Sequence, residues 1–243
     1  MSGVESELGG ATATQMKVPS LRERKCAKTK LALVRAALSR MSEKRFDAIT
    51  VKELCEDAEL SEATFFNYFP RKDDLLRYYT QLWAIELGRE AEARVGARAG
   101  IEYIEHVFES TGRQVEGNPS LLLQLLRFLA QNPDTVRKRE SRGIGLAEQM
   151  HAFPGLGDAK CNICGLTDLF LPPLERAIES CQLTRTLDTD AALLALLNTF
   201  CGVPLWLGET EPAAVRSEYA RQLELLWTGM RAGACSKTHP GSP

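Results

Sequence analysis

The sequence predicts an all-α fold, with a small three-helix domain at the N-terminus and a larger helical domain behind it. Apolar residues recur at intervals of three and four along most of the chain. No segment shows the apolar/polar alternation of a half-buried strand, and glycines and prolines separate the helical segments. With 243 residues, of which 44% are hydrophobic and 26% charged, the composition is that of an ordinary globular protein.

The charge is distributed unevenly along the chain. The net charge is only −2, but residues 17–52 contain eleven basic and three acidic residues. From residue 81 onward the acidic residues outnumber the basic ones by 20 to 16. A basic N-terminal segment on a mildly acidic body is typical of a module that binds a polyanion, although a solvated helix face would have the same composition.

The sequence shows no targeting or membrane segment. Residues 1–20 lack the apolar core of a signal peptide, and no run of about 18 apolar residues predicts a membrane span. The seven cysteines are scattered, so we expect reduced thiols in a cytoplasmic protein.

Local signals define four helices in the first hundred residues. The first begins at Leu21 and fades near residues 42–45, where its apolar spacing ends. Thr50 and Glu53 form a capping-box pattern that opens a short helix over residues 51–57. Ser61 is the N-cap of a helix that cannot continue past Pro70, since proline disfavours a helical residue before it. Two short helices joined by a tight turn predict a helix-turn-helix, and a fourth helix runs from about residue 72 to 94.

The rest of the chain also reads as helices. A Gly/Pro-rich loop is expected at residues 151–165, a basic helix before it at 137–139, and a helix over 166–183 that Pro172-Pro173 kink. Two long apolar helices, 191–207 and about 212–230, end the domain. The expected division is a flexible arm at 1–20, a helix-turn-helix domain at 21–80, a larger helical domain at 81–232, and a flexible tail at 233–243.

Residues from about Lys30 to Leu76 resemble the DNA-binding domain of the TetR family of bacterial transcriptional regulators. The matching features are the Phe46 loop, Thr50, the Ser61-x-x-Thr64 helix with its aromatic run, and Pro70-x-Lys72-x-x-Leu75. The resemblance implies a dimeric regulator, a repressor in many relatives, that binds a palindromic operator and is released by a small, apolar ligand. The sequence departs from the family pattern at Glu62, Ala63 and Phe66, which affects the details of operator contact.

The resemblance and the helix-turn-helix geometry together assign the DNA contacts. The first residues of the second helix reach base edges, while basic residues and helix N-termini hold phosphates. Phe65 and Phe69 share a face and are expected in the core. Phe66 is interpreted as structural at the helix edge, with a place along a sugar-phosphate backbone as the alternative. Glu62 has the alternative of only stabilising its helix terminus. The expected DNA-binding residues are Thr50, Glu62, Ala63, Thr64, Asn67, Tyr68, Lys72, Arg24 and Lys28.

The second domain is expected to hold the effector and the dimer interface. The predicted ligand pocket is lined by apolar residues of the middle helices, for each of which core packing is the alternative: Tyr103, Val107, Phe128 and Phe170. The resemblance implies that the last two helices form the dimer interface, with these residues: Leu193, Leu197, Phe200, Leu223, Leu226 and Trp227.

Other classes of function have weaker support in the sequence. The pair Cys161 and Cys164 leaves open a thiol- or metal-sensing regulator, but a structural zinc site usually needs four ligands, so no metal or cofactor is expected. The chain has no Gly-rich phosphate loop, no nucleophile elbow and only three histidines, so an enzyme is not expected. A partner-binding module without DNA binding rests on Glu62 alone.

Overall fold

The computed structural model describes residues 18–133, 135, 143–155 and 161–232. Throughout these residues the regular elements are helices, which confirms the all-α prediction. The elements are α1 (Leu21–Met41), η1 (Phe46–Ala48), α2 (Val51–Asp57), α3 (Glu62–Tyr68), α4 (Lys72–Val95), α5 (Ile101–Gly117), α6 (Pro119–Gln131), α8 (Leu146–Ala152), α9 (Leu166–Glu179), α10 (Thr189–Leu207), η2 (Pro212–Ala214) and α11 (Val215–Ala232).

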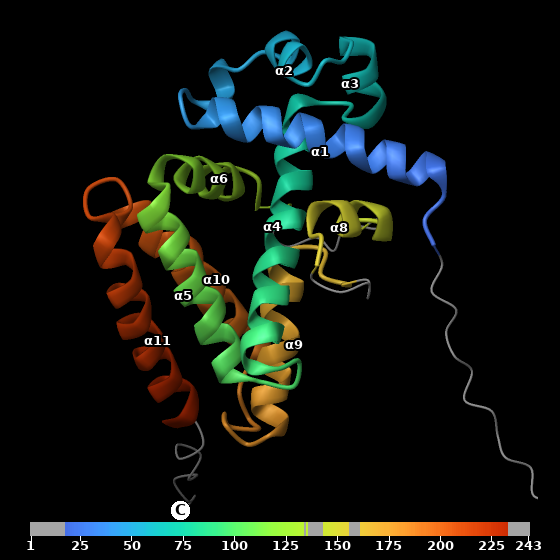
Figure 1. Ribbon diagram of the computed structural model, residues 1–243. Helices are drawn as coiled ribbons and strands as arrows, with labels where there is room; N and C mark the ends of the chain where they lie inside the picture. Colours follow the sequence, from blue (N-terminus) through green and yellow to red (C-terminus); the bar gives the residue numbers. More distant parts are fainter. Residues whose placement is uncertain (1–17, 134, 136–142, 156–160, 233–243) are drawn as a thin grey trace, which may run out of the picture.

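Helices α1, α2 and α3 form a head that lies across one end of the body (Figure 1). The side chain of Ser20 caps α1, and Glu23 completes the capping box. The predicted box at α2 is also present, because Glu53 N–H donates to Thr50 Oγ1 at 3.2 Å and Thr50 N–H donates to the Glu53 carboxylate at 2.8 Å. These caps satisfy backbone N–H groups that a helix start otherwise leaves unpaired.

Helix α4 connects the head to the body as one continuous helix (Figure 1). It begins beside α3 and descends through the middle of the body as far as Val95. Gly96, with a φ of 91°, ends it in a conformation that favours glycine. The expected domain boundary at residue 80 therefore falls within a continuous helix that belongs to both the head and the body.

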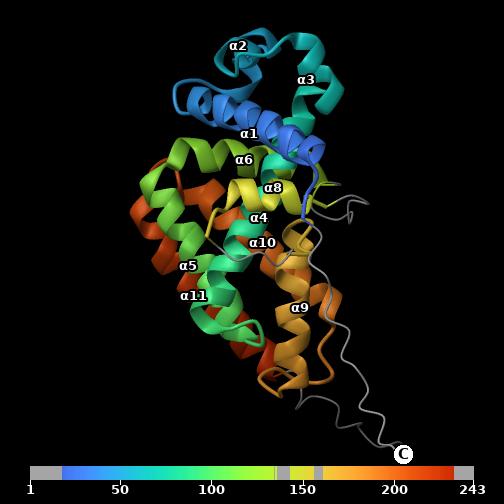
Figure 2. The same cartoon turned by 45° about the vertical axis from the view of Figure 1, so that its right-hand side comes forward.

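In the body, α5, α6 and α9 pack against α4, whereas α10 and α11 pack against each other and against α5; Figure 2 shows α9 beside α4 and α10 behind it. Its centre is an aromatic cluster. The Phe108 ring centroid lies 4.8 Å from that of Tyr219 and 5.3 Å from that of Phe200, and Phe200 lies 5.1 Å from Phe170. The buried Tyr219 hydroxyl donates to Phe200 O at 2.6 Å, so the only polar atom of its side chain is paired.

The structure differs from the prediction in two places. Residues 146–152 form α8, which packs against α1, so the loop expected at 151–165 begins only after Ala152. Helix α9 runs through both Pro172 and Pro173, as predicted, but it ends at Glu179 and not at residue 183. The predicted basic helix at 137–139, most of the N-terminal arm (1–17) and the C-terminal tail (233–243) lie outside the described residues.

One helix in the described part of the chain, α10, is long and apolar enough to span a membrane by length and composition. No membrane span is expected from the sequence, because polar and small residues interrupt the apolar run, but the mean hydropathy of the helix is still 1.5. Only 28% of this stretch is buried in the monomer, so α10 presents a largely apolar face that the chain itself does not cover.

Candidate nucleic-acid interface and effector site

Two aromatic rings hold α3 in place. Phe65 is fully buried and Phe69 is 3% exposed, and their ring centroids are 5.7 Å apart. Phe69 also lies 5.5 Å from the ring of Tyr78 on α4. At the other end, Ser61 caps the helix by accepting from Thr64 N–H at 3.2 Å. As expected from their spacing of four, the two phenylalanines face inward and fix which side of α3 faces solvent.

The outward side of α3 carries the short polar and small residues expected there. Glu62, Ala63 and Asn67 are exposed, while Thr64 and Tyr68 are half-buried. Thr50, Arg24 and Lys28 are exposed as well, on α1 and at the start of α2. Phe66 is 48% exposed, although the sequence analysis took it as structural. A ring beside the polar residues of α3 is therefore an additional candidate for DNA contact.

The turn between α2 and α3 has an unusual residue at its bend. Glu59 has a φ of 55°, in the left-handed region where glycine is common. The N–H of Leu60 donates to Cys55 O at 2.8 Å and closes the end of α2. This turn sets the angle between the two short helices.

Lys72 makes contacts that differ from the phosphate role assigned to it. Its ammonium donates to Phe46 O at 2.9 Å, Asp47 O at 3.2 Å and Ile49 O at 2.9 Å. It also lies 4.7 Å from the centre of the Phe46 ring. An ammonium has three hydrogens to donate, and all three are used here. Lys72 therefore links the start of α4 to the loop that precedes α2.

An ionic cluster, which the sequence analysis missed, joins α2 to α1. Arg40 contacts Asp57 at 2.5 Å and Glu53 at 2.9 Å, and Lys44 contacts Glu53 at 2.5 Å. The hydrogen bond from Lys44, followed by those from Thr50, lowers the pKa of Glu53 to about 2. The partners are 13 and 9 residues away from Glu53, so no single-helix spacing rule finds them.

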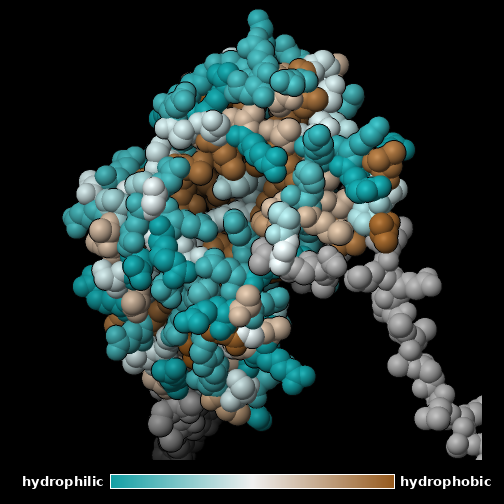
Figure 3. Space-filling view, in the orientation of Figure 1, coloured by the Kyte–Doolittle hydropathy of each residue, from teal (hydrophilic) through white to brown (hydrophobic). Residues whose placement is uncertain are grey.

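A cavity of about 350 Å³ lies between α4, α5 and α6. The space-filling view shows apolar side chains gathered in a hollow between α6 and α4 (Figure 3). Its volume is in the range of small-molecule sites, which are mostly apolar with a few polar groups. It is lined by Tyr79, Trp83, Glu86, Gln114, Gly117, Asn118, Leu121, Leu122 and Leu125.

Few polar groups line this cavity. Trp83 Nε1–H donates to Gln114 Oε1 at 2.7 Å and ties α4 to α5. Burial, with a smaller contribution from Glu86, raises the pKa of Tyr79 to about 12. Burial and the neighbouring Glu90 also raise the pKa of Glu86, whose side chain lies partly exposed at the opening. The side chains of Tyr79 and Glu86 therefore line the same cavity as the leucines of α6.

Helix α6, which lines this cavity, is also hydrogen-bonded to the head. Gln124 of α6 donates from Nε2 to Met41 O at 2.9 Å and accepts the N–H of Phe46 at 2.8 Å. Leu121 and Leu125, one turn apart on the same helix, line the cavity. Gln124 therefore links α6 to both ends of the α1–η1 loop.

The structure does not bring the four predicted pocket residues together around one cavity. Tyr103, Val107 and Phe170 are at most 3% exposed and belong to the packed core. Phe128 lies instead at a small hollow of about 100 Å³ between α6 and the head. Their burial follows from packing between distant helices, which their spacing along the sequence does not determine.

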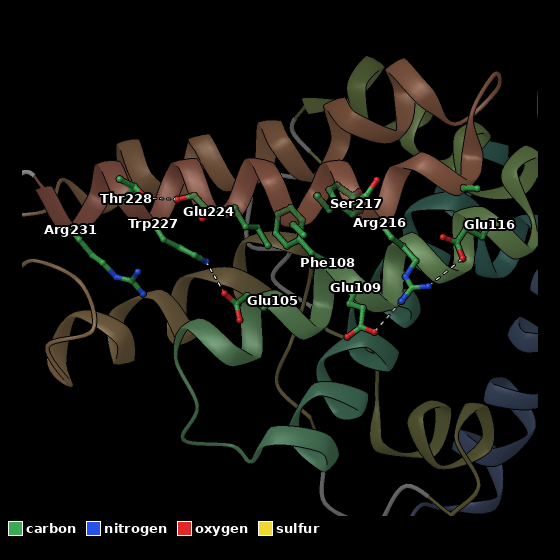
Figure 4. A pocket seen from close by; sticks show the side chains of 14 residues that line it. Glu105, Phe108, Glu109, Glu116, Arg216, Ser217, Glu224, Trp227, Thr228 and Arg231 are labelled. Carbon is green, nitrogen blue, oxygen red and sulfur yellow. Dashed lines mark hydrogen bonds and ion pairs between the residues drawn. The ribbon is translucent and has the colours of Figure 1, made fainter.

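A larger groove of about 820 Å³ runs between α5 and α11 (Figure 4). Its polar groups are paired with one another: Trp227 Nε1–H donates to Glu105 at 3.0 Å, and Arg216 reaches Glu109 at 3.5 Å and Glu116 at 3.7 Å. Neither of its helices makes more than slight contact with the head. The cavity between α4, α5 and α6 is therefore better placed to influence α3.

Most of the residues predicted for the dimer interface, on the last two helices, are buried inside the monomer. Phe200, Leu223 and Trp227 are at most 4% exposed and pack inside the monomer. Leu197 is 9% exposed, and Leu193 and Leu226 are half-buried. The apolar residues that these helices present to solvent are different ones: Leu194 at 48%, Leu225 at 63% and Trp206 at 85% exposed.

Cys161 and Cys164 lie in the segment that precedes α9. Cys161 is half-buried, and burial raises the pKa of its thiol, which disfavours the reactive thiolate. Its N–H donates to Gln149 at 2.8 Å, and the N–H of Cys164 donates to Asp168 at 3.1 Å. In the described part of the chain no group of three or more His, Cys, Asp or Glu side chains is arranged to hold a metal ion. These contacts fit a structural role for the segment.

Comparisons with known proteins place this fold. A comparison with curated proteins found no matching sequence. Among solved structures, the Thermus thermophilus repressor FadR in complex with lauroyl-CoA is 24% identical, with a TM-score of 0.60 over 88% of this chain and 99% of that one. A Bacillus subtilis FadR with stearoyl-CoA is 16% identical (TM-score 0.55, 82% and 98% covered), and a Rhodococcus TetR regulator is 17% identical (0.52, 83% and 98%).

The family comparison falls on the head and the start of α4. Residues 33–79 match the model described as bacterial regulatory proteins of the tetR family. This range contains α2, α3 and the aromatic anchors described above. The head and the start of α4 are therefore similar to the tetR family of bacterial regulatory proteins over residues 33–79, a range that contains the helix-turn-helix at residues 51–68.

Proposed function

We propose that this protein is a cytoplasmic, dimeric transcriptional repressor that binds a palindromic operator and leaves it when a small apolar molecule binds. The observation that carries the proposal is the exposed polar edge of α3, held outward by Phe65 and Phe69. In a helix-turn-helix, the N-terminal residues of the second helix reach base edges in the major groove. In this proposal the protein acts by binding DNA and an effector, not by catalysis. Residues 21–80 form the DNA-binding domain, and residues 81–232 form the effector and dimerisation domain.

The base contacts come from the exposed edge of α3. Asn67 pairs with an adenine edge, Thr64 contacts a thymine methyl group, and Glu62 accepts from a cytosine amino group. Tyr68 and the exposed basic residues Arg24 and Lys28 hold phosphates. Lys72 acts indirectly, because its ammonium is used to position the entry to α2.

Dimerisation is supported by the uncovered face of α10 and α11. Trp206, Leu194 and Leu225 are strongly exposed apolar residues on the two helices that end the body. A two-fold axis beside these helices would pair the same patch with itself and bury it. Two heads on one dimer would read two half-sites about one DNA turn apart.

The cavity between α4, α5 and α6 is proposed as the effector site. A ligand there contacts α4, which runs into the head, and α6, whose Gln124 holds Met41 and Phe46. If the ligand favours a displaced α6, it shifts the two heads away from the spacing that the operator requires. The T. thermophilus and B. subtilis neighbours hold lauroyl-CoA and stearoyl-CoA, and the leucine wall supports an aliphatic chain as the ligand class here.

Selection of binding sites from random duplexes at low salt tests DNA binding. We expect enrichment of a palindrome, with binding that weakens steeply as salt rises. The variant Asn67→Ala should lose discrimination at one base position in each half-site, whereas Glu175→Gln, an exposed change on α9, should behave like the parent. No enriched palindrome at low salt would contradict the proposal.

Thermal shift and operator release test the effector site. Lauroyl-CoA, free laurate and coenzyme A alone separate the contributions of chain and head group. We expect the aliphatic compounds to raise the melting temperature and release the operator. Leu121→Trp, which fills the cavity from its half-buried wall, should abolish both effects, whereas Val95→Trp at the end of α4 should not. An undiminished response of Leu121→Trp would place the effector site elsewhere.

A further inference from the structure

Helix α8 lies between the head and the body, and Glu148 on it contacts both. Glu148 Oε1 accepts from Lys30 Nζ of α1 at 2.8 Å and from the Tyr78 hydroxyl of α4 at 3.2 Å. Its other oxygen accepts the N–H of Gly145 at 2.6 Å, at the start of α8. One carboxylate thus joins three helices that are far apart in the sequence.

The ion pair between Lys30 and Glu148 is shielded from solvent. Their side chains are 23% and 13% exposed, and the ammonium lies 5.0 Å from the centre of the Tyr78 ring. For comparison, Lys52 and Glu56 on α2 are 3.9 Å apart with 75% and 59% exposure. A charge pair with little solvent access interacts more strongly than an open one, and loss of one partner leaves the other charge poorly solvated.

The neighbouring residue anchors α8 to the body. The Gln149 side chain is fully buried and donates to Ile144 O at 3.0 Å and Cys161 O at 2.8 Å. Its oxygen accepts from Cys161 N–H at 2.8 Å and from Arg89 of α4 at 3.2 Å. With Gln149 fixed in this way, Glu148 is presented to α1 from a rigid support.

Two anchors on one helix define its direction. Gln124 holds the C-terminal end of α1 at Met41, and Glu148 holds its middle at Lys30. The two points are roughly 16 Å apart at the helical rise of about 1.5 Å per residue. Since α2 packs on α1 and α3 packs on α2, the direction of α1 decides where α3 points.

We propose that Lys30 and Glu148 form an interdomain ion pair that sets the orientation of the head, which makes Glu148 a positioning residue for DNA binding. The proposal rests on the proposed function. It assigns α8 a role separate from the effector cavity: α6 responds to the ligand, whereas α8 holds the head in the orientation that fits the operator.

The competing role for Lys30 is a direct phosphate contact, since it belongs to the basic face of α1. The two roles predict opposite effects for Glu148→Gln. If Lys30 holds a phosphate, removal of the adjacent carboxylate frees it, and DNA affinity stays equal or rises. If Lys30 holds Glu148, the same change weakens the anchor and lowers DNA affinity, although the protein has lost a negative charge.

A double-mutant cycle decides between them, using the duplex recovered by selection. We expect Lys30→Met and Glu148→Gln each to lower operator affinity about tenfold, and the double variant to be no weaker than the weaker single, as coupled residues behave. Lys30→Arg should stay within about threefold of the parent, because a guanidinium also pairs with a carboxylate. Glu175→Gln is the control for the change in charge. Unchanged or higher affinity of Glu148→Gln, or additive losses, would overturn the proposal.

Hydrogen exchange on the DNA-free protein tests the ion pair independently of DNA binding. Both single variants should speed exchange of amides in residues 144–152 and in the first half of α1, with exchange in the aromatic core of the body unchanged. Parent-like exchange in α8 would overturn the interdomain ion pair, even if an operator is found. Faster exchange in α8 without any selected duplex would sustain the ion pair and remove the proposed function.

Discussion

Gln124 and Phe46 join the body to the head through a hydrogen bond of 2.8 Å from the Phe46 N–H to Gln124 Oε1. The same side chain donates to Met41 O at 2.9 Å, so it spans both ends of the loop between α1 and η1.

Replacing Gln124 by Met should remove both bonds while keeping the shape of the side chain. The unpaired N–H and carbonyl should lower the free energy of unfolding by about 1–2 kcal/mol. Ligand should then release the operator less completely, because α6 is no longer hydrogen-bonded to the head. Urea unfolding and release assays measure the two effects. Gln131→Met, an exposed change on the same helix, is the control, and equal behaviour of the two variants would contradict the coupling.

Lys72→Met should destabilise the head as well as weaken DNA binding. Three carbonyl oxygens lose their donor, and we expect a loss of about 1–2 kcal/mol in the free energy of unfolding. Thermal melting measures it, with the exposed Lys52→Met on α2 as the matched control. A direct phosphate contact predicts another pattern, namely unchanged melting and a smaller salt dependence of binding.

The contribution of Glu53 to stability should depend on pH. Its pKa in the folded protein is about 2, below the ordinary value of 4.5, because the folded state stabilises the charged form. The stabilisation is therefore complete above about pH 4.5 and is lost as pH falls toward 2. Glu53→Gln should melt below the parent at pH 7, and the difference should disappear near pH 2. A difference that does not change between pH 7 and pH 3 would show that the charge of Glu53 is not responsible.

Trp206→Glu should dissociate the proposed dimer. The indole is 85% exposed on α10, so the change has little effect on the monomer core but places a charge in the proposed interface. Sedimentation should show a smaller species, and operator affinity should fall by at least tenfold because one head reads only one half-site. Val95→Glu, at an exposed apolar residue at the end of α4, should stay dimeric. A dimeric Trp206→Glu protein would place the interface on another surface.

Short-range signals were enough to predict the helices of the head. The capping box at Thr50, the cap at Ser61 and the break at Pro70 act over three or four residues, and α2 begins and ends at the predicted residues. The inward placement of Phe65 and Phe69 follows from their spacing of four. Helix α8 was missed because it begins at Gly145 without a side-chain cap, and because its partners lie on α1 and α4.

The candidate effector site needed the structure. Trp83, Gln114 and Leu121 lie on three different helices, and nothing in their sequence spacing brings them to one cavity. The residues chosen from the sequence, such as Phe170 and Val107, had the right apolar character, but the packing of α5 against its neighbours places them in the solid core.

By itself the sequence determined the helical class, the helix-turn-helix and the side of α3 that faces outward, because capping and helical periodicity act between near neighbours in the chain. Only the tertiary structure decided that Lys72 ties a loop, that Glu148 pairs with Lys30, and that α10 and α11 leave Trp206 and Leu225 uncovered. Those outcomes depend on which helix faces meet, and this is set by the packing of the whole core.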